Sequence, residues 1–292
     1  MAYNPEIERG NARVLELLSV YLNETPAAIT GEMVRELAEA CALTPREAYA
    51  QLLAACCGLD AAGSAADRAL FRDYFLPMTQ ALDADAYASD PYYRNIRIPA
   101  AREGSWEFRR ECLRPYEAFV FDDLRRLPDG RVLPQIGFFE RAFPYPAVLE
   151  NGREWMLITP NEITTMRPAV ATARGRVLAY GLGLGYFAYM AAEKPEVEAV
   201  TVVERDPNVL RLFRRHILPQ FPHADKLTLV EADAFAFART RMGAGGYDVV
   251  FTDLWHDPGD GVDLYLRMKA LEKNSPGSRF LYWIEETLRC YL

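Results

Sequence analysis

The 292-residue sequence predicts an α/β protein whose last part is a doubly wound, mostly parallel sheet. Three observations predict this fold class. Residues 160–292 alternate short apolar runs with amphipathic stretches, an order typical of strand-helix-strand units. Residues 1–90 are rich in Ala, Leu and Glu, which favour helices. Residues 91–159 hold short runs rich in Trp, Tyr and Phe, which favour a small antiparallel β subdomain. We therefore expect three consecutive domains with these boundaries.

The N-terminal helical region, residues 1–90, is predicted to be a bundle of about four helices, because apolar residues recur in it at spacings of three and four. Residues 44–47, Thr-Pro-Arg-Glu, form a capping box at the start of one helix. Gly63 and Ser64 mark a break between helices. Three roles stay open for the bundle: a lid, a homodimer contact or a partner site.

The second region, residues 91–159, is predicted to form hairpins. Residues 127–130, Leu-Pro-Asp-Gly, make a tight turn, and residues 155–158 form one of the apolar runs. The region ends on residues 159–162, Thr-Pro-Asn-Glu, which repeat the capping-box pattern. We expect a capped helix to begin there.

The third region, residues 160–292, is predicted to contain five parallel strands joined by helices. In an open parallel sheet, ligands bind beyond the carboxyl ends of the strands, where the strand order reverses. The site should therefore be built from the residues that follow each strand. The predicted strands are 176–180, 199–203, 227–230, 247–252 and 279–284, and the predicted helices are 187–193, 206–217, 234–239 and 262–272.

A glycine-rich loop follows the first of these strands. Gly181, Gly183 and Gly185 allow the backbone to approach a ligand closely with its amides pointing at it. Glu204 ends the second strand, where a carboxylate can accept hydrogen bonds from both hydroxyls of a ribose. Taken singly, the glycines also fit a tight turn without a ligand, and Glu204 also fits a solvated strand end.

Acidic residues also follow the third and fourth strands. Asp233 and Ala234 come after the third, where a small residue beside an acid can flank a flat base, although Asp233 would serve equally as a helix cap. Asp253 ends the fourth, beside the space for a second substrate. One such feature after each of four successive strands favours a nucleoside site over separate structural roles.

The ligand that this pattern favours is a nucleoside without phosphate. A dinucleotide fingerprint needs a third glycine where the chain has Tyr186. No Gly-Lys-Ser/Thr segment is present to hold a phosphate. Ribose and adenine without a phosphate group fit the residues better.

These motifs resemble the class I S-adenosylmethionine-dependent methyltransferases, and within them the spermidine synthase-like branch. The resemblance covers residues 160–292 and rests on residues 177–185, 201–206, 231–235 and 247–253. It implies a Rossmann-like fold and S-adenosyl-L-methionine as the cofactor. By this resemblance, Gly181, Gly183 and Gly185 pass the methionine part, Glu204 takes the ribose, and Asp233 with Ala234 takes the adenine.

Two departures from the spermidine synthase-like pattern matter. The aminopropyltransferases carry an aspartate in the glycine loop where this chain has Leu184, so aminopropyl transfer ranks below methyl transfer. Methyltransferase sheets of this class usually finish with a strand hairpin after the fifth strand, and the sequence has only about eight residues after Ile284. We expect that sheet edge to be missing or covered by the N-terminal part.

Asp253 is the first candidate to orient or deprotonate the acceptor, with His256 and Asp257 as alternatives. Trp255 is expected either to stack on the acceptor or to close the edge of the pocket. The acids after the fourth and fifth strands suggest a small, cationic or amine-containing acceptor, although a solvated acidic loop explains them almost as well.

Charge and composition exclude several partners. The formal net charge is −8, without the basic excess that phosphate neutralisation requires, so a nucleic-acid partner is not expected. The five cysteines lack C-x-x-C spacing and there are three histidines, so no metal site is expected. We interpret the cysteines as reduced, mostly buried thiols of a cytoplasmic protein. No stretch suits a signal peptide or a membrane span.

Three functions stay open from the sequence. The first is a methyltransferase acting on a small molecule. The second is an aminopropyltransferase that uses decarboxylated S-adenosylmethionine. The third is a non-catalytic nucleoside-binding scaffold that holds a partner through its helices.

Overall fold

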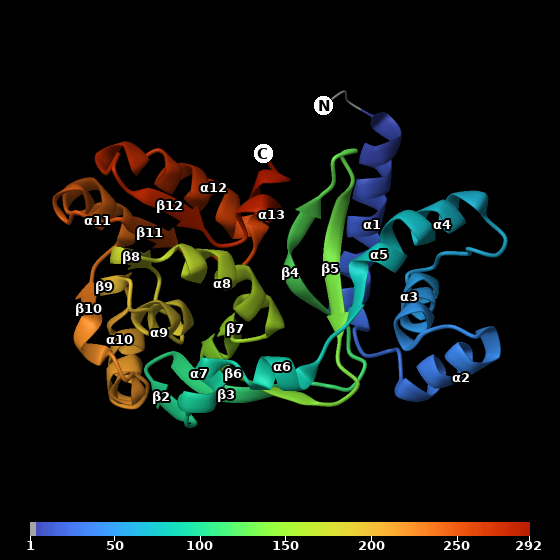
Figure 1. Cartoon of the computed structure of the whole chain (residues 1–292), viewed down its shortest axis with the longest axis horizontal. Helices are drawn as coiled ribbons and strands as arrows, with labels where there is room; N and C mark the ends of the chain where they lie inside the picture. Colours follow the sequence, from blue (N-terminus) through green and yellow to red (C-terminus); the bar gives the residue numbers. More distant parts are fainter. Residues whose placement is uncertain (1–3) are drawn as a thin grey trace. The chain divides into compact units, whose positions relative to one another are not determined.

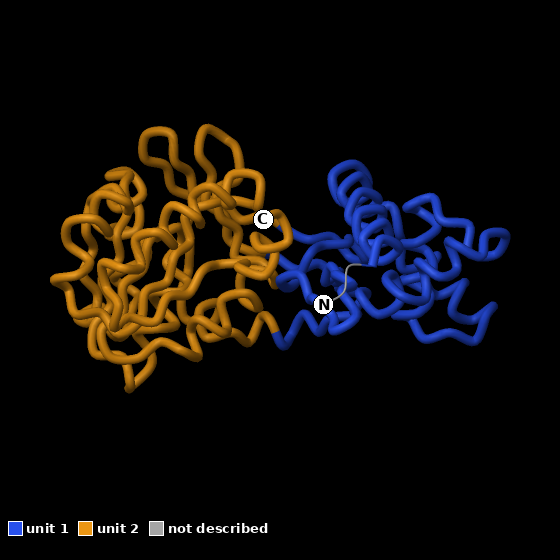
Figure 2. Tube along the Cα trace, turned by 90° about the horizontal axis from the view of Figure 1, so that it is seen from above, with its two compact units in different colours: residues 1–86, 112–144 blue, residues 87–111, 145–292 orange. Residues whose placement is uncertain are grey.

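The computed structural model describes residues 4–292, and Figure 1 gives the order of the elements. The chain divides into two compact units, coloured separately in Figure 2: residues 1–86 with 112–144, and residues 87–111 with 145–292. This differs from the three consecutive domains expected from the sequence. Strands of the expected subdomain 91–159 belong to two different sheets, and their long-range partners decide which unit each one joins.

The first unit contains the predicted N-terminal helices. The side chain and backbone of Thr44 exchange hydrogen bonds with Glu47, which confirms the capping box at the start of α3. The break at Gly63 and Ser64 is also confirmed, because Ser64 caps the next helix. The helices are α1 (Pro5–Glu24), α2 (Gly31–Cys41), α3 (Pro45–Cys56), α4 (Ala65–Leu70) and α5 (Leu76–Met78), with a π-helical turn at Phe71–Phe75 between the last two.

A three-stranded sheet completes the first unit. Its order is β1-β5-β4, with β1 (Thr79–Ala81) parallel to β5 (Val132–Phe138) and β4 (Phe119–Arg126) antiparallel to it. The predicted turn at residues 127–130 joins β4 to β5. All seven residues of β5 are buried, and Leu133, Ile136 and Phe138 share one apolar core with the helices.

The second unit begins with a four-stranded sheet in the order β2-β3-β6-β7. These strands are β2 (Ala101–Glu103), β3 (Trp106–Leu113), β6 (Phe143–Glu150) and β7 (Arg153–Leu157), and the short helices before them are α6 (Ala84–Ala88) and α7 (Pro91–Asn95). The boundary between the units falls within α6, β3 and β6. The pairs β2·β3 and β6·β7 are antiparallel, as expected for this part of the sequence.

Helix α8 (Pro160–Thr172) begins where the sequence predicts a helix, but the predicted capping box is wrong. The Thr159 side chain makes no capping hydrogen bond. Glu162 is buried instead of reaching back over the helix end. A capping box needs the glutamate side chain to accept from the N-cap amide, but the amide of Thr159 donates to the carbonyl of Leu157 at 2.9 Å.

The rest of the second unit is the predicted doubly wound domain. Its five strands are all parallel and lie in the order β10-β9-β8-β11-β12, which is third, second, first, fourth, fifth along the chain. This is the Rossmann-like order, which reverses between β8 and β11. The strands are β8 (Gly175–Tyr180), β9 (Val197–Glu204), β10 (Leu227–Glu231), β11 (Val249–Thr252) and β12 (Arg279–Tyr282); the helices are α9 (Tyr186–Ala192), α10 (Pro207–His216), α11 (Ala234–Thr240), α12 (Pro258–Lys269) and α13 (Glu285–Arg289).

Both faces of the parallel sheet are covered, because alternate residues of each strand point to opposite sides. On one face, Tyr180 packs edge-on against Phe237 of α11, in a core shared with α12 and α13. On the other face, Phe251 of β11 contacts Phe187 of α9, with 4.3 Å between ring centroids. This two-sided burial explains why the strands are nearly continuous apolar runs in the sequence.

The register of the parallel strands brings their carboxyl ends level with one another. Tyr180 lies opposite Val203 and also opposite Thr252, which in turn lies opposite Tyr282. The residue that follows each of these therefore emerges at one edge of the sheet: Gly181, Glu204, Asp253 and Trp283.

The cysteine prediction is partly wrong. None of the five cysteines is in a disulfide, but Cys41, Cys56 and Cys112 are exposed, and only Cys57 is buried. Their helix and strand positions face solvent, so the thiols do not contribute to a core as expected. Within residues 4–292, no helix combines the length and the apolar character needed to cross a membrane.

Candidate functional site

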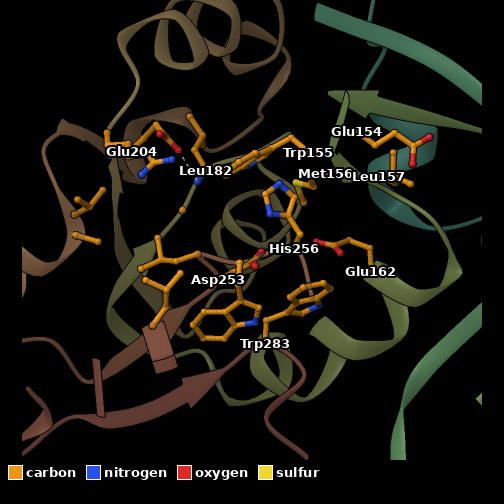
Figure 3. Close-up of a pocket in the computed structure, with 18 of the residues that line it drawn as sticks. Glu154, Trp155, Met156, Leu157, Glu162, Leu182, Glu204, Asp253, His256 and Trp283 are labelled. Carbon is orange, nitrogen blue, oxygen red and sulfur yellow. Dashed lines mark hydrogen bonds between the residues drawn. The ribbon is translucent and has the colours of Figure 1, made fainter. Parts of the chain in front are cut away.

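A cavity of about 330 Å³ lies at the carboxyl edge of the parallel sheet, within the second unit (Figure 3). Most of the residues that the sequence singled out line this one cavity. Those lining it are Gly181, Gly183, Glu204, Asp233, Ala234, Asp253 and His256, whereas Gly185 and Asp257 are not part of its wall.

The glycine loop brings its backbone to the cavity because its first two glycines have no side chain. Gly181 has φ = 96°, and its amide donates to the carbonyl of Val203. A Cβ at Gly181 would overlap the carbonyl oxygen of Asp253, and a Cβ at Gly183 would overlap the sulfur of Met156. Gly183 also has a positive φ of 49°. Only glycine meets both requirements at these positions.

Gly185 has a structural role instead. It begins α9 with φ = 77°, and a Cβ there would overlap the ring of Phe213. Its conformation allows close helix packing, which is the role of the last glycine in such loops. Gly185 therefore shapes the loop from outside the cavity.

Glu204 is oriented by the backbone around it. One carboxylate oxygen accepts from the amide of Leu182 at 3.2 Å, and the other accepts from the amide of Asp206 at 2.8 Å. Burial raises the pKa of Glu204, while these amides and the neighbouring charge of Arg205 oppose the rise. Each oxygen keeps a second lone pair for a ligand hydroxyl.

Asp233 and Ala234 line the cavity at the start of α11. An oxygen of Asp233 accepts from the amide of Ala236 at 2.8 Å, so the residue caps the helix, which is the structural alternative noted from the sequence. Ala234 is buried and leaves room beside this acid. The two readings of Asp233 are compatible, because the cap uses only one of its oxygens.

Two carboxyl groups face each other inside the cavity. Asp253 follows β11, and Glu162 comes from the first turn of α8 (Figure 3). Burial raises the pKa of Asp253 to about 7. Burial and the charge of Asp253 raise the pKa of Glu162 well above its usual range. Two carboxylates in one desolvated space cannot both ionise easily, so the pair retains a proton near neutral pH.

The sequence reasoning missed Glu162 because it assigned this residue to a helix cap. The residue is 6% exposed, and no hydrogen bond from a described residue reaches its carboxyl group. The sequence did contain a signal for this position. Helix α8 directly precedes β8, the strand that the glycine loop follows, so an acid in the first turn of the helix can lie near the carboxyl end of that strand. The capping-box pattern gave a simpler explanation and hid it.

His256 is held in place by two neighbours. Its Nδ1 lies 2.8 Å from a carboxylate oxygen of Asp260, and its ring meets that of Trp155 edge-on with 4.0 Å between centroids. Burial disfavours the charged form of Asp260, but hydrogen bonds from His256 and nearby amides outweigh this and lower its pKa. The unbonded Nε2 of His256 is therefore the nitrogen that remains for a ligand.

Asp257 serves the helix that follows it. Its side chain accepts from the amide of Gly259 and forms a capping box with Asp260 at the start of α12. This helix begins at Pro258, earlier than the sequence predicts. Asp257 is therefore replaced as an acceptor-binding candidate by Glu162, which lines the cavity.

Strand β7 forms a wall of the cavity that the sequence assigned to a separate domain. Trp155, Met156 and Leu157 all line it. The sulfur of Met156 lies 3.1 Å from the backbone nitrogen of Leu184 in the glycine loop. A run of four apolar residues carries no sign of which sheet edge it will cover, so only the tertiary structure reveals this wall.

Trp255 and Trp283 complete the aromatic part of the wall. Trp255 is 5% exposed and belongs to the apolar core with Tyr265 and Leu288, so it closes the edge of the pocket. Trp283 follows β12, and its indole nitrogen donates to Thr165 of α8 at 2.9 Å. Both rings are held by the surrounding protein.

The ionisable residues of the lining are mostly acidic. Among the described residues of the wall, Arg205 is the one Arg or Lys side chain, against the carboxyl groups of Glu154, Glu162, Glu204, Asp233 and Asp253. Such a wall repels a phosphate group and attracts a cation. Among residues 4–292, no cluster of three or more His, Cys, Asp or Glu side chains could hold a metal ion.

No known protein family and no curated protein matches this chain. Solved structures do resemble it. The cofactor-bound protein Rv0187 from MTB is 23% identical with a TM-score of 0.30, and the match covers 40% of this chain and 52% of the other. For precorrin 8W decarboxylase from Methanobacterium thermoautotrophicum, identity is 20%, the TM-score 0.33, and coverage 42% and 62%.

Spermidine synthase from Thermotoga maritima is 15% identical with a TM-score of 0.34, and the match covers 57% of this chain and 51% of the other. The chain thus spans about half the length of these structures. All have the fold of the class I S-adenosylmethionine-dependent methyltransferases, the fold that the sequence resemblance implies. At these identities and TM-scores they say nothing of the reaction, and it is the strand order of this chain that shows its Rossmann-like fold.

Proposed function

We propose that the protein is an S-adenosyl-L-methionine-dependent methyltransferase that acts on a small amine-containing molecule. One observation carries this proposal: Gly181, Gly183, Glu204 and Asp233 line the same cavity at the carboxyl edge of the parallel sheet. A carboxylate at the end of the second strand and an acid at the end of the third suit an adenosyl group.

The residues of the cavity fit this cofactor by their chemistry. Gly181 and Gly183 line the cavity with backbone alone, and the sulfur of Met156 occupies the space that a Cβ on Gly183 would fill. Glu204 supplies acceptors for ribose hydroxyls, and Ala234 leaves room for a flat base beside Asp233. The acidic lining disfavours nucleotides, because it would repel their phosphates. A sulfonium compound without phosphate has the charge that this lining favours.

When bound, S-adenosylmethionine supplies an activated methyl group, so the protein mainly has to bind and align the acceptor. Asp253 is the group we propose to orient the acceptor and take its proton, because it lines the cavity with a pKa raised to about 7. His256 is the alternative, with its Nε2 available while Asp260 holds Nδ1. The aromatic wall of Trp155 and Trp283 excludes water from the same space.

Aminopropyl transfer is the second candidate, and the acidic wall supports it too. Decarboxylated S-adenosylmethionine lacks a carboxylate and is the more cationic of the two compounds. Two observations favour methyl transfer. Leu184 is fully buried and lies outside the lining, so the loop offers no carboxylate for an amine. Arg205 lines the cavity and offers a cation for the carboxylate of S-adenosylmethionine.

Calorimetric titration with S-adenosylmethionine, its decarboxylated form and NAD tests the proposal. We expect S-adenosylmethionine to bind most tightly and Glu204→Gln to weaken it about tenfold, because the variant loses a charged hydrogen bond. Glu231→Gln is the matched control, since Glu231 lies opposite Glu204 on β10 and is not part of the cavity wall.

Preference for the decarboxylated form would reverse the two enzymatic candidates. If none of the three compounds binds the folded protein, a non-catalytic scaffold becomes the better description.

A further inference from the structure

The carboxyl group of Glu162 is a buried polar group of the cavity wall. The residue is 6% exposed and lines the cavity, and its carboxyl has no hydrogen-bond partner among the described residues. Leaving a carboxyl group buried without a hydrogen-bond partner is costly, and such groups occur where a catalytic role or a bound water, ion or ligand completes the site. Glu162 is therefore evidence for a ligand in its own right.

Asp253 lies across the cavity from Glu162. Figure 3 shows both carboxyl groups directed into the middle of the pocket, one from α8 and one from the loop after β11. The backbone fixes both residues in place. The amide of Asp253 donates to the carbonyl of Tyr180 at 2.9 Å, and Glu162 lies in helix α8. The two groups thus form a fixed pair of acceptors.

No cation of the described residues neutralises this pair. No ion pair joins Glu162 or Asp253 to a Lys, Arg or His among residues 4–292. Of the nearby ionisable groups, the ring of His256 pairs with Asp260 and the hydroxyl of Tyr186 donates to Asp90. Arg205 lies near Glu204 and the ring of Trp155 and forms no ion pair with Glu162 or Asp253. A cationic ligand would therefore be the group that allows both carboxyls to ionise.

The surroundings of the pair suit an organic cation better than a metal ion. Trp155, Met156, Leu157 and Trp283 line the same cavity. Aromatic faces and apolar side chains attract an alkylammonium group through its charge and its carbon atoms together. A hydrated metal ion would need more oxygen ligands than two carboxyl groups provide.

We propose that Glu162 and Asp253 together bind the protonated nitrogen of a primary or secondary alkylamine, and that Asp253 takes its proton. This deepens the proposed function and rests on it for the identity of the amine as methyl acceptor. In the proton step, the N–H bond of the ammonium breaks and the O–H bond of the Asp253 carboxyl forms. The electron pair stays on nitrogen, as the lone pair that a methyl acceptor needs. Glu162 is a binding residue that holds the ammonium during this step.

Calorimetric titration of the full chain with n-butylamine, in two buffers of different ionisation enthalpy, tests the proposal. Because the free pair retains a proton, binding of the cation should release it to the buffer. We expect butylamine to bind with proton release and the uncharged butan-1-ol, of equal length, to bind at least tenfold more weakly. Equal binding of the amine and the alcohol, or amine binding without proton release, would overturn the proposal.

The variant Glu162→Gln tests the residue assignment with nearly the same shape. We expect it to bind butylamine at least tenfold more weakly and with less proton release. Glu154→Gln is the matched control: it removes one carboxylate from the same wall, but Glu154 is exposed. A loss in Glu154→Gln as large as in Glu162→Gln would mean that only the net charge of the pocket matters, and would refute the pair.

Cofactor binding separates this proposal from the proposed function. We expect Glu162→Gln to bind S-adenosylmethionine within about twofold of the parent, which also shows that the variant is folded. Should the parent bind butylamine with proton release but not S-adenosylmethionine, the amine site would stand and the methyltransferase proposal would fail. If the parent binds S-adenosylmethionine but not butylamine, the methyltransferase proposal would stand and the amine site would fail.

Discussion

The thioether sulfur of Met156 lies 3.1 Å from the backbone nitrogen of Leu184, so a side chain of β7 accepts a hydrogen bond from the glycine loop. The same sulfur occupies the space that a Cβ on Gly183 would fill. Strand β7 and the loop after β8 thus come into contact at Gly183 and Leu184, where the lack of a Cβ on Gly183 leaves room for the Met156 sulfur. Met156 controls how much of the loop a ligand can reach.

Shortening Met156 should open the glycine loop. In Met156→Ala the sulfur is removed, and we expect S-adenosylmethionine to bind several-fold more tightly because more of the loop is accessible. The free energy of unfolding should fall by about 1 to 2 kcal/mol, because apolar contacts are lost. Calorimetry and urea unfolding measure the two effects, and Met156→Leu is the control that keeps the bulk. Weaker binding in Met156→Ala would show that the side chain contacts the cofactor directly.

An alanine at position 183 should be costly for two separable reasons. Its Cβ would overlap Met156, and Gly183 has a φ of 49°. We expect Gly183→Ala to lower the free energy of unfolding by about 2 to 3 kcal/mol in the parent. In the Met156→Ala background the loss should shrink to about 1 kcal/mol, which is the backbone part alone. Equal losses in both backgrounds, measured by urea unfolding, would argue against the contact between the two residues.

The buried carboxyl pair should make stability depend on pH. Burial raises the pKa of Glu162 in the folded state, so the folded protein binds more protons than the unfolded chain above about pH 4.5. The contribution of Glu162 to the free energy of unfolding is therefore complete below about pH 4.5. It is lost as the pH rises through the pKa that Glu162 has in the folded protein. Asp253, with a pKa raised to about 7, behaves in the same way.

Glu162→Gln should remove the Glu162 part of this dependence. We expect the variant to exceed the parent in unfolding free energy by about 1 to 3 kcal/mol at pH 8, and the gap to narrow towards pH 5. His256 and Asp260 remain unchanged in both proteins, so the difference between them reports on the buried pair, including the effect that the loss of Glu162 has on Asp253. Urea unfolding across pH 5 to 8 measures it, and a gap that stays constant with pH would contradict the raised pKa.

The two capping-box sequences should respond differently to the same substitution. The side chain of Thr44 accepts from the amide of Glu47, whereas Thr159 makes no capping hydrogen bond. We expect Thr44→Ala to lower the free energy of unfolding by about 1 kcal/mol and Thr159→Ala by less than about 0.5 kcal/mol. Urea unfolding of both variants provides the comparison. Equal losses would restore the capping interpretation of residues 159–162.

Arg205 should distinguish the two sulfonium compounds. It lies in the cavity wall, with its guanidinium 5.9 Å from the ring centroid of Trp155. We expect Arg205→Gln to weaken S-adenosylmethionine about three- to tenfold and to leave the decarboxylated form unchanged, because only the former has a carboxylate to pair. Calorimetry with both compounds measures this. If both compounds bind more weakly to the same extent, the role of Arg205 would be to orient Glu204 and not to pair with the carboxylate of S-adenosylmethionine.

Much of the parallel sheet was predictable from the sequence. Apolar runs and amphipathic stretches alternate there, because strands that are buried on both faces require nearly continuous apolar sequences. Gly181, Glu204, Asp233 and Asp253 were predictable for the same reason, since each follows a strand whose carboxyl end must lie at one edge. Local capping at residues 44–47 was equally accessible, because it involves neighbours in the chain.

What the sequence could not supply are the contacts between distant segments. Residues 155–157 belong to β7, and nothing in an apolar run says that it will cover a glycine loop nearly thirty residues away. The position of Glu162 was not predictable either. The residues around it predict a helix cap, but its side chain is buried at the cavity. Sequence periodicity determined the sheet and its carboxyl edge, because these follow from local patterns of burial. The tertiary structure alone decided which side chains face Asp253 across the cavity, because that depends on packing between elements.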